Sequence, residues 1–169
     1  MRLPSQKEPA KRTDDWLTPP AILDAVRKLG PIVLDPCSHP RSLVSAEITI
    51  EEELDGLAWP WEVEGLIFAN PPYSNLAPWL AKCAAEAARP GVEIVALVPP
   101  RVDTAAFHSH VFGVASAIAF PRGRISFLHA ETLEPRKGND TPSCLIYYGA
   151  RPGAFALAFA PFCSVLPAR

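Results

Sequence analysis

The sequence predicts an α/β fold in which a mostly parallel sheet has an antiparallel edge at its C-terminal end. Short apolar runs alternate with helical patterns as far as residue 120, and two further apolar runs follow residue 142 with no helical pattern between them. Such alternation favours a parallel sheet covered on both faces, and consecutive strands favour antiparallel pairing. The 169 residues suit one domain, predicted over 14–169 behind a flexible polar arm at 1–13.

Composition narrows the class of protein. Hydrophobic residues make up 49% and charged residues 20%, as in globular domains, although 20 prolines are unusual. No apolar stretch reaches the ~18 residues of a membrane-spanning helix, and the N-terminus has no apolar signal region, so a cytoplasmic protein is expected. With a net charge of −2, any nucleic-acid binding needs a local basic patch. Four well-separated cysteines predict neither a zinc site nor a disulfide framework.

The first predicted helix begins after Thr18, whose hydroxyl can cap it, and a Pro-Pro pair follows where no amide donor is needed. Apolar residues recur at helical spacing until Gly30 ends the helix. The apolar run 31–35 predicts a buried strand that ends in the carboxylate of Asp35. Irregular structure is expected over 36–47 and a short strand over 48–50.

The middle of the chain predicts a second helix between two buried strands. The first of these strands covers the apolar run 66–69. Ser74 or Asn75 can cap the helix that follows, whose apolar face extends over 76–87. The next strand is predicted over 93–98.

The C-terminal part of the chain predicts a short helix and three strands. Asp103 can cap the helix, which is expected to end near Phe112, and a strand follows over 115–120. The remaining predicted elements are a turn at 121–124, a polar loop at 129–142, and two strands at 143–149 and 154–162 that form a hairpin around 151–153.

The tetrapeptide Asn70-Pro71-Pro72-Tyr73 is the most informative motif. Ligands of open α/β sheets bind beyond the carboxyl ends of the strands, where this motif is expected. The prolines fix an extended backbone whose carbonyls are acceptors, Asn70 adds a side-chain acceptor, and Tyr73 adds a flat aromatic face. This set suits a planar ring that bears an amino group. The alternative is a proline-rich turn with no chemical role.

Several motifs, taken in order, resemble those of the phage-type, Dam-like DNA N6-adenine methyltransferases. The resemblance covers most of residues 14–149. It includes Asp15-Trp16-Leu17-Thr18-Pro19, Leu34-Asp35-Pro36-Cys37-Ser38, Asp55-Gly56-Leu57 with Trp61, Asn70-Pro71-Pro72-Tyr73-Ser74, Arg101-Val102-Asp103-Thr104 with Phe107-His108, Gly123-Arg124-Ile125-Ser126-Phe127, and Pro142-Ser143.

The resemblance implies a Rossmann-like fold and direct methyl transfer from S-adenosylmethionine to the amine of a flipped adenine. The implied catalytic residues are Asn70 and Pro71, which would hold the amine, Tyr73, which would stack on the base, and Pro72 between them. Implied DNA contacts come from loops, because the 34 residues between Asp35 and Asn70 (36 to 69) leave no room for a recognition domain. These contacts are Arg101, Asp103, Arg124 and Ser143.

The resemblance also implies a cofactor site. Asp35 would lie beside the methionine moiety, Glu51 would hold the ribose hydroxyls, and Asp55 would contact the adenine amine. The full implied set is Trp16, Thr18, Pro19, Asp35, Pro36, Cys37, Glu51 and Asp55. Plain structural roles stay open: a turn or cap for Asp35, an Asp-Gly turn for Asp55, and a solvated charged face for 51–53. The glycine-rich loop of many methyltransferases is missing after the first strand.

Two other functions remain open at this stage. A methyltransferase acting on RNA or on a protein glutamine amide would share the tetrapeptide, but such enzymes usually keep a glycine-rich cofactor loop. A non-catalytic nucleic-acid-binding module could keep the fold, although the intact Asn70 and Tyr73 disfavour it.

Overall fold

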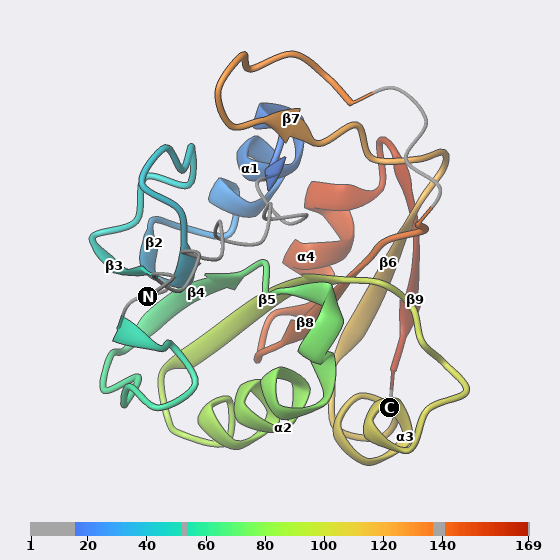
Figure 1. Cartoon of the computed structure of the whole chain (residues 1–169). Helices are drawn as coiled ribbons and strands as arrows, with labels where there is room; N and C mark the ends of the chain where they lie inside the picture. The colour runs from blue at the N-terminus through green and yellow to red at the C-terminus, as the bar shows by residue number, and fades with distance from the viewer. Residues whose placement is uncertain (1–15, 52–53, 137–140, 169) are drawn as a thin grey trace, which may run out of the picture.

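In the computed structural model, which describes residues 16–51, 54–136 and 141–168, the chain forms a mixed sheet with helices on both faces (Figure 1). Within these residues the large sheet has seven strands. In spatial order they are β3 (Ile48–Glu51), β2 (Ile32–Ser38), β4 (Gly65–Ala69), β5 (Val92–Val98), β8 (Cys144–Tyr148), β6 (Ala117–Pro121) and β9 (Cys163–Pro167).

The first four strands of this order are parallel, as the alternating pattern predicts. The last three pair in antiparallel fashion, so the predicted antiparallel part of the sheet is present. Its order differs from a simple terminal hairpin, because β8 lies between β5 and β6 and β9 forms the edge. A separate two-stranded ribbon joins β1 (Trp16–Leu17) to β7 (Leu128–His129).

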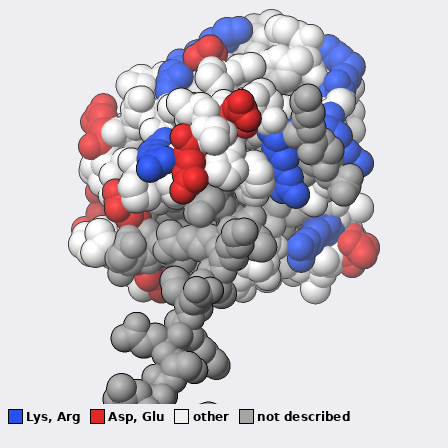
Figure 2. Space-filling model, turned by 45° about the horizontal axis from the view of Figure 1, so that its top comes forward, with Lys and Arg blue, Asp and Glu red and all other residues white. Residues whose placement is uncertain are grey.

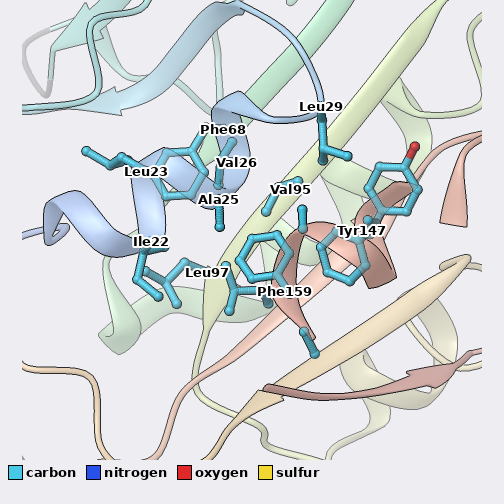
Figure 3. Packing of buried hydrophobic residues seen from close by; sticks show 14 of the residues in the cluster. Ile22, Leu23, Ala25, Val26, Leu29, Phe68, Val95, Leu97, Tyr147 and Phe159 are labelled. Carbon is cyan, nitrogen blue, oxygen red and sulfur yellow. The ribbon is translucent and has the colours of Figure 1, made fainter. Parts of the chain in front are cut away.

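Four helices in the described residues cover the sheet. They are α1 (Pro20–Arg27), α2 (Leu76–Glu86), α3 (Ala105–His110) and α4 (Pro152–Phe159). One core cluster joins α1 and α4 to one face of the sheet, where Leu23, Phe68 and Phe159 are fully buried (Figure 3). A second cluster joins α2 and α3 to the opposite face. Within the described ranges, no helix is both long and apolar enough to cross a membrane.

The predicted strand over 154–162 is wrong. The chain forms α4 there, and the edge strand β9 starts only at Cys163. A continuous apolar run has no period that separates a buried strand from a buried helix. Pro152 is compatible with the helix because the first turn needs no amide donor.

The predicted capping residues are also wrong. Pro19, not Thr18, precedes α1, and α1 has no side-chain cap. Asn75 precedes α2 without a capping hydrogen bond, and a 3₁₀ turn over Tyr73–Asn75 leads into that helix. Thr104 rather than Asp103 caps α3, since its hydroxyl accepts from the amide of Phe107.

Strand β2 continues beyond Asp35 as far as Ser38, where irregular structure was predicted. Its pairing with β3 shifts register between Asp35 and Ser38, and such an irregularity tolerates a proline that has no amide to donate. The predicted arm at 1–13 lies outside the described residues.

Candidate functional site

Parallel strands β2, β4 and β5 are neighbours, so their carboxyl ends meet at one edge of the sheet (Figure 1). Asp35 lies at the middle of β2, where the pairing with β3 becomes irregular, Asn70 follows β4, and Arg101 follows β5 within a short turn. Three segments far apart in the sequence are therefore brought together where the sequence predicts a ligand. This edge is the candidate active site.

The side chain of Asn70 is oriented by Thr18, which directly follows β1. Its Nδ2 donates to Oγ1 of Thr18 at 3.2 Å, and Thr18 is only 4% exposed. Thr18 is placed by β1, which pairs with β7. An amide whose nitrogen donates to Thr18 keeps its oxygen as an acceptor. The threonine predicted as a helix cap is thus a partner of the tetrapeptide.

Tyr73 is half-buried, and its ring packs edge-on against Phe127 with 6.4 Å between the centroids. The backbone carbonyl of Tyr73 accepts a 3.0 Å hydrogen bond from Nη2 of Arg101. Pro71 is buried and Pro72 is exposed. Arg101 thus holds the backbone of Tyr73 at the end of the tetrapeptide, and Thr18 holds the side chain of Asn70 at its start.

Asp35 is buried, with 2% of its surface exposed. Its carboxylate accepts from the amide of Cys37 at 3.1 Å and from the hydroxyl of Ser42 at 3.3 Å, and Ser38 adds a further hydrogen bond. All of these described donors are neutral. Burial raises the pKa of Asp35 to about 6, and the hydrogen bonds offset only part of that shift. A carboxylate in this position favours a cationic ligand group.

Cys37 belongs to β2, and its thiol contacts the backbone of Asn70 just after β4. Burial is the main cause that raises the pKa of its thiol well above the usual value, the nearby Asp35 raises it further, and a hydrogen bond with the backbone of Asn70 lowers it. A thiol with such a pKa stays protonated and is a poor nucleophile. Cys37 is therefore not expected to act as a nucleophile at this site.

The loop after β3 lies against the end of β2. Asp55 is exposed with a φ of 49°, and its Oδ1 accepts from the amide of Leu57 at 3.0 Å, which is an Asp-Gly turn. The indole of Trp61 donates to the carbonyl of Gly56 at 2.9 Å. Lys82 of α2 donates to the carbonyls of Leu57 and Trp59 at 2.9 and 2.7 Å. These contacts hold the turn beside Pro36 of β2.

Gly56 approaches β2 so closely that no side chain fits. A Cβ at this position would lie 1.9 Å from the carbonyl oxygen of Pro36, which is backbone and cannot rotate away. Gly56→Ala is therefore expected to lower the free energy of unfolding by about 3 kcal/mol, the upper end of the usual cost of overpacking. Urea denaturation measures the change.

Gly153→Ala is the matched control, because a Cβ there meets nothing within 4 Å and the position is helical. It should stabilise the protein by about 0.5–1 kcal/mol. Equal stability of the Gly56 variant and the unmodified protein would contradict the close approach.

The other residues predicted for the site lie around its rim. Glu51 ends β3 and is half-buried. Ser143 directly precedes Cys144, which pairs with Val98 at the end of β5, so Ser143 lies at the same edge of the sheet. Arg124 and Asp103 are exposed in the loops after β6 and β5. The four residues that the sequence predicts as DNA contacts therefore lie in segments at this edge of the sheet.

Basic residues near the site differ in what they contact. Arg122 donates to the carbonyls of Ala160, Pro161 and Cys163 and so holds the end of α4. The guanidinium of Arg136 lies 4.6 Å from the ring centroid of Trp16. In Figure 2, which brings the top of Figure 1 forward, most basic side chains lie on the right and most acidic ones on the left.

Several residues of the site carry no signal that sequence reasoning could use. Ser42 contacts Asp35, Arg41 donates to the carbonyl of Ala130 at 3.3 Å, and Lys82 holds the 55–61 loop. Each acts through contacts that depend on the tertiary fold. Among the described residues, no group of three or more His, Cys, Asp or Glu could hold a metal ion.

Comparison with known proteins gives one match. A family model described as DNA N-6-adenine-methyltransferase (Dam) matches residues 5–153. Neither a curated protein nor a solved structure matches the chain.

Proposed function

The chain belongs to the DNA N-6-adenine-methyltransferase (Dam) family, and we propose that it methylates the N6 amine of adenine in DNA with S-adenosylmethionine as the methyl donor. The observation that carries this proposal is the tetrapeptide at the carboxyl end of β4, whose Asn70 is oriented by Thr18. An oriented amide oxygen beside fixed proline carbonyls supports recognition of an exocyclic amine.

The proposed roles of the tetrapeptide follow from its acceptors. The side-chain oxygen of Asn70 and the carbonyl of Pro71 would accept the two hydrogens of the adenine amine. Acceptors on both hydrogens raise the electron density on nitrogen and aim its lone pair along one direction. Pro72 keeps the backbone extended, and the half-buried ring of Tyr73 would stack on the extruded base. The Arg101 contact holds the Tyr73 backbone for this task.

The residues around β2 fit the proposed cofactor. When bound, S-adenosylmethionine supplies an activated methyl group. Asp35, whose described donors are all neutral, would hold its ammonium group. The Asp55–Gly56 turn, held against Pro36, would form a wall of the site, and Glu51 at the end of β3 would take the ribose hydroxyls. Trp16, Thr18, Pro19, Pro36 and Cys37 complete the proposed lining.

We further propose a single catalytic domain over 14–169 with a Rossmann-like methyltransferase fold. The parallel order β3-β2-β4-β5, with helices on both faces and the site at the carboxyl ends, supports this assignment. DNA is the proposed macromolecular partner, with Arg101, Asp103, Arg124 and Ser143 on the DNA-facing rim.

Radiolabelled methyl transfer tests the proposed function. Unmethylated duplex DNA, RNA and total protein are each incubated with the purified chain and labelled S-adenosylmethionine, and the nucleosides are then separated. Label is expected only in N6-methyldeoxyadenosine. Label in RNA or protein alone would contradict the assignment.

A further inference from the structure

A cavity of about 170 Å³ opens beside the tetrapeptide, between the start of α2 and α3. Ser74 and Asn75, which directly follow Tyr73, form one side of it, and Arg101 and Thr104 form the other. Leu76 and Leu80 contribute apolar surface. Among the described lining residues none is acidic, so Arg101 gives the cavity a positive charge.

Arg101 connects this cavity to the proposed amine-binding site. Its exposed guanidinium donates to the carbonyl of Tyr73 through Nη2 only, and it forms no salt bridge within the described chain. A guanidinium has five donors in a planar fork, so donors remain for an anion while the Tyr73 contact persists.

The backbone of Arg101 is held by its own turn. Its amide donates to the carbonyl of Pro99 at 2.9 Å, and its carbonyl accepts from the amide and hydroxyl of Thr104 at 3.1 and 2.8 Å. The guanidinium therefore starts from a fixed backbone, which lowers the entropy cost of a defined contact.

We propose that this cavity is a subsite for the sugar–phosphate of a nucleotide flanking the target adenine, with Arg101 on its phosphate. The inference rests on the proposed function and names a DNA contact of the same site. The polar rim and the arginine suit the phosphodiester, and the apolar surface of Leu76 and Leu80 suits the deoxyribose. One arginine then contacts both the DNA backbone and the tetrapeptide, so that docking of the flanking nucleotide fixes the position of Tyr73.

The test compares Arg101→Gln, which removes the charge, with Ala77→Phe, which fills the cavity. Ala77 lines the cavity and is exposed on α2, so a larger side chain is compatible with folding. Ala85→Phe is the matched control, since Ala85 is exposed on the same helix but does not line the cavity. Thermal unfolding confirms that each variant is folded.

Binding is measured by anisotropy of a fluorescent duplex that the unmodified protein methylates, over a series of KCl concentrations. One phosphate contact contributes about 0.9 to the slope of log K against log salt, so Arg101→Gln and Ala77→Phe should each lower the slope by about one. Ala85→Phe should leave it unchanged, and calorimetric binding of S-adenosylhomocysteine should be the same in all variants.

Unchanged slopes in both variants would overturn the subsite. Loss in Arg101→Gln alone would also overturn it, because the arginine would then contact DNA outside the cavity. If the unmodified protein neither methylates nor binds any duplex, the proposed function itself fails. This outcome is distinct from the other two, which concern the variants.

Discussion

Replacement of Asn70 by alanine is expected to lower kcat for methyl transfer by about 10²–10³-fold. The loss is that typical of removing one preorganised polar group from the reacting centre. The side-chain nitrogen of Asn70 donates to the hydroxyl of Thr18. The side-chain oxygen is therefore the acceptor that would hold the target amine. Alanine removes this acceptor but leaves Asp35 and the 55–61 loop in place, so cofactor binding should survive.

Single-turnover assays with labelled S-adenosylmethionine measure the rate, and calorimetry with S-adenosylhomocysteine measures the cofactor affinity. Ser109→Ala is the control, because Ser109 is exposed on α3 and does not line the cavity beside the tetrapeptide. Full activity of the Asn70 variant would remove the proposed amine-holding role. A large loss of cofactor affinity would instead place Asn70 in the cofactor site.

A Thr18 substitution has a smaller expected effect, but the Asn70–Thr18 pair shows what limits prediction from sequence. The two residues are 52 positions apart, and the local signal at Thr18 indicates a helix cap. Only the pairing of β1 with β7 brings that threonine to the end of β4. The preference of threonine for helix N-caps concerns only residues close in sequence. It therefore predicts that the Thr18 hydroxyl accepts from the first amides of the following helix.

Strands β4 and β5 were predictable because burial on both faces leaves a strong, simple signal. Their apolar runs are short, and each ends at prolines that cannot continue a buried ladder. The tetrapeptide could be placed for the same reason, since it follows β4 directly. Helix α4 was not predictable in this way: four of its eight residues are Ala or Leu and two are Phe, which suit either element.

Asp35 gives the second large expected effect. Asp35→Asn should weaken binding of S-adenosylmethionine by at least about tenfold, since a hydrogen bond to a charged group contributes about 1.5–3 kcal/mol. An asparagine can still accept from the amide of Cys37, so the loop geometry is expected to persist. Asp24→Asn, on the exposed side of α1, is the control and should leave the dissociation constant unchanged.

The same substitution should stabilise the free protein at neutral pH. Burial raises the pKa of Asp35 from 3.8 to about 6, so the native state binds more protons than the unfolded state between these values. The stability contributed by the protonated carboxyl is therefore fully present below about pH 4 and is lost as pH rises through about 6. By this linkage, Asp35→Asn should match the unmodified protein at pH 4 and exceed it by up to about 3 kcal/mol at pH 8.

Urea denaturation across this pH range measures the difference, with Asp24→Asn as the parallel control. If the free energies of unfolding of Asp35→Asn and of the unmodified protein differ by the same amount at every pH, Asp35 does not titrate between pH 4 and 6. A variant that gains stability and keeps its cofactor affinity would show a buried carboxylate with no ligand role. We expect Asp35→Asn to raise stability and to lower cofactor affinity at the same time. A carboxylate that is buried without a cationic partner lowers the stability of the free protein. The same carboxylate becomes favourable when the cationic group of the ligand binds beside it.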